Sequence, residues 1–377
     1  MPRRRPTLLL LAALLSLPAT ALADDCPAPG AWQHRGDAAA PDELLRELAG
    51  ERVVLLGERH DSMAHHRWQL HTLAALHARR PGLAIGLEML PRAAQPALDA
   101  WVAGELDPAE FLEESDWHTA WGHDPELYLP ILHFARMQRI PLVALNVTPE
   151  LRRRLAEQGW EAVPEEERHG LSPPAPASSA YRDALAEVYA EHPEANEDGN
   201  GLERFIAAQL VWDRAMAEGL ARAAETAPLV VGLVGEGHVT HGHGVPHQLA
   251  SLGITQTASA LAWDRERGCP APAGIADALF GLDDESRHEP SSPRLGVMLL
   301  PDTAGIRVAQ VEPDSVAQAS GLLEEDVIVA AAGRAVETPG ELVATLRRQA
   351  PGTLLPLEVL RDGEVREILA RFPAEAP

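Results

Sequence analysis

The sequence predicts an α/β protein in which an open, mainly parallel sheet with flanking helices precedes a small, β-rich α+β domain. Short, continuous apolar runs recur between residues 41 and 264, and segments with helical periodicity separate them, as is typical of a buried parallel sheet. Between residues 294 and 372 the apolar runs are shorter, and Asp362-Gly363 marks a hairpin turn. A chain of 377 residues is long enough for two domains with separate cores.

Five apolar runs of the first domain are expected to form strands that are buried on both faces of the sheet. These runs are Val53–Leu56, Leu83–Leu87, Leu142–Leu145, Leu229–Val234 and, more weakly, Thr257–Trp263. The helices expected between them include Met63–Ala78, Pro108–Glu114 and Glu203–Ala224. The Pro- and Gly-rich stretch from residue 265 to 293 is expected to be a linker to the second domain.

The first 23 residues have the pattern of a secretory signal peptide. Three arginines precede an apolar run, and the small residues Ala21–Ala23 form the expected cleavage site. The sequence therefore predicts a periplasmic or secreted protein whose mature chain begins at Asp24. A lipid anchor on Cys26 is disfavoured, because two aspartates immediately precede it where such a site needs small residues.

Charge and cysteine content restrict the partners and the compartment. The net charge is −24, and loss of the three signal-peptide arginines from the 32 basic residues makes it −27 for the mature chain. Because phosphates repel such a chain, no nucleic-acid partner is expected. Cys26 and Cys269 are the only cysteines. They either form a disulfide that joins the mature N-terminus to the end of the first domain or remain two free thiols.

Two similar motifs follow two of the predicted strands. Glu58 and His60 follow the first strand in "VVLLGERHD", and His238 follows a later strand in "LVVGLVGEGHV". Glu88 ends the apolar run "AIGLEM". Because ligands of open parallel sheets bind at the carboxyl ends of the strands, we expect these four side chains to converge on one cleft.

Such a cluster fits three kinds of chemistry. It could bind a divalent metal such as Zn, Mn or Co, perform acid–base catalysis, or surround a cofactor. A polar network that only orders the strand ends is the alternative. Nine of the 16 histidines surround the two motifs, which favours a functional site. As metal ligands or catalytic groups we name Glu58, His60, Glu88 and His238.

Further residues near the motifs are candidates for a cofactor site. The segment "DWHTAWGHDPELYLP" from 116 to 130 is rich in aromatic residues, which suits a flat, apolar ligand. His65 and His66 begin the helix after the first motif, and His243 follows the second motif. The candidate cofactor-binding residues are His60, His65, His66, Trp117, Trp121, Tyr128, His238 and His243.

The segment from about 53 to 252 resembles the ChaN-type haem-binding domain, a branch of the Tiki superfamily. The resemblance rests on "GERHD", "GLEML", "ALNV", "AQLVWD" and "GEGHVTHGHGVP", together with the aromatic positions of the 116–130 segment. It implies haem or iron acquisition, with a tyrosine on the iron and a histidine nearby, across a homodimer. Tyr128 is the candidate tyrosine in the aromatic segment.

The same superfamily contains metal-dependent peptidases, and more distant relatives are esterases. Their Gly-x-x-His motifs and glutamate correspond here to Gly57–His60, Gly235–His238 and Glu88. The resemblance therefore implies a haem- or iron-related binding protein first and a metal-dependent hydrolase second. A periplasmic scaffold that has lost its chemistry is the third interpretation.

The segment from 294 to 372 resembles a PDZ domain. Its phrase from Asp314 to Val336 has the family's spacing, although Glu325 stands where the family usually has glycine. The resemblance implies that Leu295, Gly296, Val297 and Met298 form a loop whose backbone N–H groups bind a peptide carboxylate. The alternative is a PDZ domain that packs on the first domain and binds no peptide.

Overall fold

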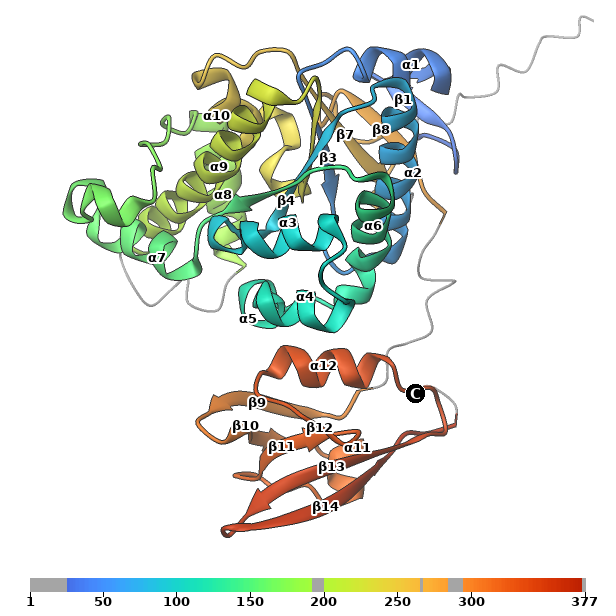
Figure 1. Cartoon of the computed structure of the whole chain (residues 1–377), viewed down its shortest axis with the longest axis vertical. Coiled ribbons are helices and arrows are strands. Elements are labelled where there is room, and N and C mark those ends of the chain that lie inside the picture. Colours follow the sequence, from blue (N-terminus) through green and yellow to red (C-terminus); the bar gives the residue numbers. More distant parts are fainter. Residues whose placement is uncertain (1–25, 192–199, 265–266, 284–293, 375–377) are drawn as a thin grey trace, which may run out of the picture.

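The computed structural model describes residues 26–191, 200–264, 267–283 and 294–374, which form two sheets (Figure 1). The first sheet has eight strands in the order β2-β1-β8-β7-β3-β6-β4-β5. These strands are β1 (Trp32–His34), β2 (Asp37–Ala39), β3 (Val53–Glu58), β4 (Ala84–Pro91), β5 (Leu142–Asn146), β6 (Val230–Gly235), β7 (Thr257–Trp263) and β8 (Ala278–Gly281). All pairs among β3 to β8 are parallel, which confirms the predicted mainly parallel sheet.

Helices cover both faces of this sheet (Figure 1). They are α1 (Pro41–Leu48), α2 (Met63–Arg79), α3 (Gln95–Ala103), α4 (Pro108–Glu114), α5 (Trp117–Ala120), α6 (Pro125–Gln138), α7 (Pro149–Gln158), α8 (Ser179–Ala190), α9 (Gly201–Thr226) and α10 (Val245–Ser251). Short 3-10 turns include η5 (Glu236–His238) and η6 (Thr240–Gly242). In the described part of the chain, no helix is both long and apolar enough to span a membrane.

Strand β3 shows why the central strands are apolar without interruption. Val54 and Leu56 belong to the core that includes residues of α1, α2 and α6, whereas Val53 and Leu55 belong to the core with α9 and α10. Successive side chains of a strand point to opposite faces, so a strand covered by helices on both sides must be apolar at every position.

The first domain is larger than the predicted range of 41–264. Strands β1 and β2 precede that range, and β8 lies inside the stretch from 265 to 293 that was expected to be a linker; this boundary prediction was therefore wrong. Strand β8 has only four residues in a Gly- and Pro-rich setting, so it gave no sequence signal. A disulfide between Cys26 and Cys269 ties the N-terminal segment to the chain that leads into β8 and confirms the pairing.

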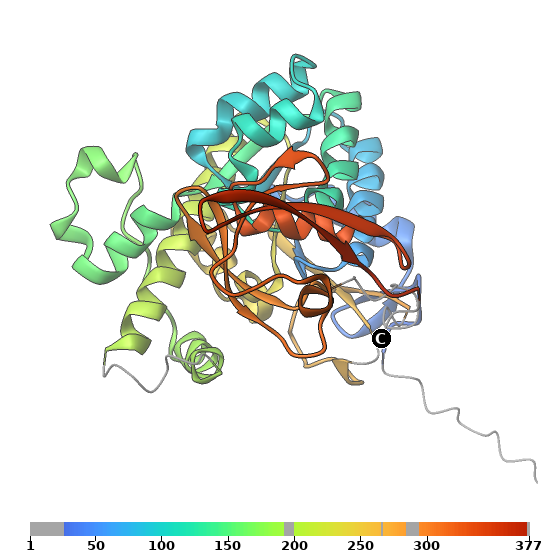
Figure 2. The ribbon, with the colours of Figure 1, turned by 90° about the horizontal axis from the view of Figure 1, so that it is seen from below.

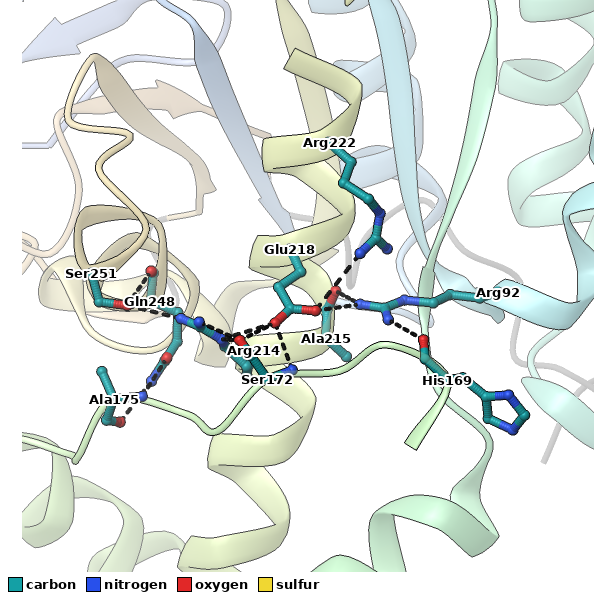
Figure 3. A network of polar contacts seen from close by, with 10 residues as sticks. All are labelled: Arg92, His169, Ser172, Ala175, Arg214, Ala215, Glu218, Arg222, Gln248 and Ser251. Atoms are coloured by element: carbon teal, nitrogen blue, oxygen red, sulfur yellow. Dashed lines mark hydrogen bonds and ion pairs between the residues drawn. The ribbon is translucent and has the colours of Figure 1, made fainter. Parts of the chain in front are cut away.

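The segment that contains His169, Ser172 and Ala175, between α7 and α8, lies beside α9 and is held there by polar contacts (Figure 3). Glu218 of α9 accepts a hydrogen bond from the backbone N–H of Ser172 at 2.8 Å and forms ion pairs with Arg92 at 3.1 Å and Arg214 at 3.2 Å. Arg92 also donates to the backbone oxygen of His169 at 3.2 Å. Helices α7 and α8 project to one side of the sheet in Figure 2.

The second domain is an antiparallel sheet with two helices, which confirms the predicted small, β-rich α+β domain. Its elements are β9 (Val297–Asp302), β10 (Gly305–Val311), α11 (Val316–Ser320), β11 (Val327–Ala331), β12 (Arg334–Ala335), α12 (Pro339–Arg347), β13 (Leu354–Arg361) and β14 (Glu364–Arg371). Strand β9 is at the edge of the sheet. Helix α12 lies against α5 of the first domain (Figure 1), where Gly340 approaches the segment that contains His118 and Gly122.

Candidate functional site

The two sequence motifs meet because β3 and β6 are parallel neighbours. Glu58, the last residue of β3, is paired with Gly235, the last residue of β6. His60 therefore follows one strand and His238 the other at the same edge of the sheet. Glu88 joins them from β4, which runs to Pro91 and thus beyond its predicted end at Leu87. The structure brings all four predicted side chains together.

Glu58 is buried and is the centre of the first half of the site. Its Oε1 atom accepts a hydrogen bond from the Tyr128 hydroxyl at 2.8 Å and lies 3.0 Å from His60 Nδ1, while Oε2 lies 3.5 Å from His66 Nδ1. Burial alone would raise the pKa of Glu58, but His60, His66 and Tyr128 outweigh it and lower the pKa. The carboxylate is therefore held ionised.

His238 is the centre of the second half. Its Nδ1 atom lies 2.6 Å from Oδ1 of Asp213, whose other oxygen accepts a hydrogen bond from Tyr181 at 2.8 Å. Its Nε2 atom lies 3.6 Å from Oε1 of Glu88. Burial lowers the pKa of His238, but the charge of Glu88 and the hydrogen bond and charge of Asp213 outweigh it, so the pKa is raised.

Each imidazole thus has a carboxylate on its Nδ1 atom. A carboxylate at one ring nitrogen fixes the tautomer and makes the other nitrogen a better ligand or base. Glu58 has this role for His60, and Asp213 has it for His238. Glu88 binds no histidine Nδ1 atom in the described part of the chain. Its Oε2 accepts a hydrogen bond from the N–H of Gly235 at 2.5 Å, whereas its Oε1 is buried and has no hydrogen-bond partner among the described residues.

Gly235 permits this close arrangement. A Cβ atom at this position would lie 2.8 Å from Cε1 of His60 and 3.6 Å from Oε2 of Glu88. Carbon atoms do not approach each other so closely without displacement. The glycine in the second motif therefore leaves room for the histidine of the first motif beside the glutamate.

Two cavities meet at His60. One, of about 370 Å³, is lined by the two motifs from Glu58 to Asp61 and from Gly235 to His238, together with His123. The other, of about 240 Å³, is lined by His60, Met89, Pro91, Ala120, Trp121, His123, Asn146, Val147, Pro149, Arg152 and Trp212. His60 is half-buried, and its ring centroid is 4.7 Å from Trp121 and 5.2 Å from His123. The site is thus an aromatic cleft with accessible imidazoles.

Comparison with known families identifies the first domain. Residues 44–249 match the family described as haem-binding uptake, Tiki superfamily, ChaN. The chain belongs to the ChaN family. A structure described as cofacial heme binding to ChaN of Campylobacter jejuni is 16% identical and covers 66% of this chain and 95% of that chain, with a TM-score of 0.52. At this identity the likeness shows the shared fold.

The second domain is a PDZ domain, because residues 293–370 match the PDZ family. A curated relative, a probable periplasmic serine endoprotease DegP-like of Halomonas elongata, is 30% identical over 106 residues. The match covers 24% of this chain and 22% of that protein, so the chain spans about a fifth of its relative. The PDZ domain of HtrA3 bound to a phage-derived ligand is 25% identical and covers 21% of this chain and 82% of that chain, with a TM-score of 0.19.

Several predicted cofactor residues of the ChaN-family domain do not line the cleft. Trp117, His65 and His66 are almost fully buried, and burial with the nearby arginines lowers the pKa of His65 to about 3. His243 lies next to Tyr181, with 5.2 Å between ring centroids, and lines neither of the two cavities. Trp117 supports the wall instead, since its ring lies 5.3 Å from that of Tyr128.

The environment of Tyr128 does not match the role of iron ligand that the family resemblance implied for it. Its side chain is 1% exposed and its hydroxyl is bound to Glu58. Burial and the charge of Glu58 raise its pKa well above the usual value. The phenolic oxygen is therefore neutral and is occupied by a protein acceptor, so the structure does not offer it to an iron atom.

Arg152, Tyr181 and His123 are site residues that the sequence-based candidates did not include. Arg152 is one of three consecutive arginines in α7, a pattern typical of an exposed helix face. Tyr181 lies in α8, far from either motif in the sequence. Asp213 shares a helix face with Gln209, so it could be either a partner of the site or a solvated residue; the structure places it against His238.

The predicted peptide-binding loop of the PDZ domain leads into the edge strand β9. Leu295 is buried, Gly296 has a φ of 78°, and Met298 is 56% exposed. A side chain at Gly296 would overlap Ser315, so the loop needs glycine for both its backbone angle and its packing. Glu325, which replaces the usual glycine, has a φ of 70° and retains the left-handed turn.

Among the described residues, no group of three or more His, Cys, Asp or Glu side chains is arranged to hold a metal ion.

Proposed function

We propose that the protein binds haem in the cleft between the two motifs and that the imidazole of His60 or His123 meets the iron. The observation that carries this proposal is that both histidines line both cavities and remain half-buried beside Trp121. Bound haem would supply an iron centre that accepts an imidazole nitrogen. Glu58, on Nδ1 of His60, would orient that ring and increase its basicity.

The side chains that line the cleft are of the types that surround a bound haem. The wall combines Met89, Trp121 and Trp212 with a few polar groups, which is the usual composition of a cofactor pocket. In this proposal Tyr128 is a positioning residue that holds Glu58 rather than an iron ligand. A homodimer that brings two clefts together is part of the same proposal.

A titration of the mature protein with hemin tests this proposal. We expect a shift of the Soret band that saturates at a fixed stoichiometry and changes or disappears in His60→Ala or His123→Ala. His71→Ala is the matched control, because His71 is exposed on α2. A saturating shift that neither cleft substitution alters would reject these ligands, and no shift in the folded wild type would reject haem binding.

We also propose that the protein is exported, that haem binding serves iron uptake, and that the PDZ domain recruits a partner through a C-terminal peptide. The disulfide supports export, because such bonds persist in oxidising compartments. The exposed edge of β9 supports peptide addition. Peptides with an apolar last residue should bind with a free carboxylate and not as amides, whereas equal binding of the two forms would contradict recognition of the terminus.

A divalent metal and hydrolysis form the second candidate function. The observation in its favour is the unpartnered Oε1 atom of Glu88, which lies 3.6 Å from Nε2 of His238. With a metal bound, Glu58, His60, Glu88 and His238 would supply the oxygen and nitrogen ligands. Metal analysis of protein purified without chelator tests it: stoichiometric Zn, Mn or Co that Glu88→Ala removes would support this function, and metal-free protein would count against it.

A further inference from the structure

The segment 117–123 forms one wall of the cleft and faces the PDZ domain. It consists of α5 and the turn that follows, and it places Trp121 and His123 at the smaller cavity. Positive φ values of 51° at Asp116 and 76° at Gly122 mark the two ends of this short helix. The wall is therefore a short piece of chain between two turns rather than a long helix.

The cleft behind this wall is divided. The two cavities measure about 240 and 370 Å³, and His60 and His123 line both of them. Pockets for drug-sized ligands usually measure about 300–1,000 Å³, and a flat macrocycle needs more room than either cavity gives. Because Glu58 holds His60 at 3.0 Å, the division is removed most readily by outward movement of His123 with its segment.

Helix α12 of the PDZ domain stands in the way of this movement (Figure 1). A Cβ atom on Gly340 would lie 3.4 Å from the backbone oxygen of His118 and 3.6 Å from Cα of Gly122. A single added carbon would thus already be in van der Waals contact, which leaves no room for water at this point. The segment cannot move outward here unless α12 moves as well.

Charged residues of α12 also act on the segment. Burial lowers the pKa of His118, whereas the charge of Glu341 opposes this effect. Burial lowers the pKa of His123, and the charges of His60 and Arg347 lower it further. Both histidines of the segment are therefore close enough to the PDZ domain to respond to its charges.

We propose that α12 clamps the segment 117–123 against the cleft, so that the PDZ domain restrains ligand binding until the contact at Gly340 opens. The inference rests on the proposed haem-binding function and adds its regulation by the second domain. If the ligand binds only when the segment has moved outward, its apparent affinity is reduced by the fraction of molecules in which the clamp is open. Because α12 also contacts β9, a peptide bound at that edge would lie next to the clamp.

The experiment opens the clamp with one side chain in the full chain. Gly340→Phe places a ring where a single carbon fits, and it should push α12 away from the segment. Gly340→Ala is the matched control, because it changes the same helix position and its Cβ atom makes only ordinary contacts. His118→Glu, which sets a second carboxylate near Glu341, opens the contact from the first domain and provides a second variant if Gly340→Phe is unstable. Circular dichroism and thermal unfolding establish that each variant is folded.

Two measurements are made on each protein. Hydrogen–deuterium exchange without ligand follows the amides of 117–123, among them those of Trp121 and Gly122, which donate to the Trp117 oxygen at 2.9 and 3.3 Å. A hemin titration gives the apparent affinity. We expect Gly340→Phe to increase both the exchange rate and the affinity by about 5-fold or more, the lower end of usual coupling between sites. Gly340→Ala should stay within about 2-fold of wild type in both.

The possible failures are distinguishable. If wild type binds hemin and Gly340→Phe neither exchanges faster nor binds more tightly, the clamp is rejected and the haem-binding proposal stands. An increase in only one of the two measurements also rejects the clamp, because the proposal ties ligand binding to opening of the segment. If neither wild type nor Gly340→Phe binds hemin, the proposed function is rejected together with its regulation.

Discussion

Tyr128 and His60 share one oxygen atom of Glu58: the phenol donates to Oε1 at 2.8 Å, and Nδ1 of His60 lies 3.0 Å from the same atom. The tyrosine is therefore part of the support of the site: it contacts Glu58, which lines the cleft, but lines neither cavity itself. A tyrosine whose hydroxyl is bound to a buried carboxylate supports the site, whereas a tyrosine that binds iron needs a free phenolic oxygen.

Tyr128→Phe should therefore lower stability without removing haem binding. Loss of a hydrogen bond to a buried carboxylate should cost about 1.5–3 kcal/mol of unfolding free energy, measured by urea unfolding. The Soret band of the hemin complex should keep its wild-type position, because the phenol is not the iron ligand. A folded Tyr128→Phe protein with a displaced or missing Soret band would restore the tyrosine as ligand.

The site should make stability depend on pH through its histidines. Burial lowers the pKa of His60 and His238, but neighbouring carboxylates, including Glu88 in both cases, outweigh it and raise the pKa above 6.5. A histidine with a raised pKa in the folded state stabilises the protein fully below pH 6.5, and this contribution is lost as the pH rises through the folded-state pKa.

Glu88→Gln tests this pH dependence, because it removes the charge that both histidines share. We expect the unfolding free energy of wild type to fall more steeply than that of Glu88→Gln as the pH increases above 6.5. Chemical denaturation at several pH values between 6 and 9 measures the two slopes. Parallel curves would show that Glu88 does not set the protonation of these imidazoles.

Glu58 should act in the opposite direction in acid. The pKa of Glu58 is lowered from 4.5, so its stabilising contribution is present above pH 4.5 and is lost as the pH falls through the lower folded-state pKa. Glu58→Gln should flatten the decline of stability below pH 4.5, as measured by thermal unfolding. An unchanged decline would assign the acid sensitivity to other carboxylates.

The Cys26–Cys269 disulfide closes a loop with a sequence separation of 243 residues. Because a cross-link of this kind restricts the unfolded chain, its removal should cost about 2–5 kcal/mol. Cys26→Ser, Cys269→Ser and the double variant should show the same loss, measured by urea unfolding under oxidising conditions. A double variant as stable as wild type would mean that β8 holds its place without the cross-link.

Glu218 should hold the segment that contains His169 and Ser172 against α9 (Figure 3). Its carboxylate is buried among Arg92, Arg214 and Ser172, and removal of one partner from such a network costs about 3–5 kcal/mol. We expect Glu218→Gln to increase protease cleavage between residues 163 and 178. Glu225→Gln, on an exposed position of the same helix, is the control, and equal cleavage of the two variants would contradict the role of Glu218.

The repeated motifs were sufficient to predict the main site, because parallel strands place their carboxyl ends at one edge. Glu58, His60, Glu88 and His238 are therefore readable from two apolar runs and the residues that follow them. Asp213 and Tyr181 could not be assigned in this way, since Asp213 contacts His238 and Tyr181 contacts Asp213 from two helices whose rotation about their axes is set by packing. The linker prediction failed at β8, where four residues gain a strand conformation from pairing with β7 and β1.

The sequence alone was enough to predict the parallel α/β class, the two-domain order and the four central site residues, because apolar periodicity and motif spacing are local properties of the chain, whereas it left open whether Cys26 and Cys269 pair. The tertiary structure decided which candidates face the cleft. It buried Tyr128, His65 and Trp117 and left His123 and Arg152 at the wall. The physical reason is that solvent access and charge pairing depend on contacts between distant segments, and those contacts exist only after the helices have packed on the sheet.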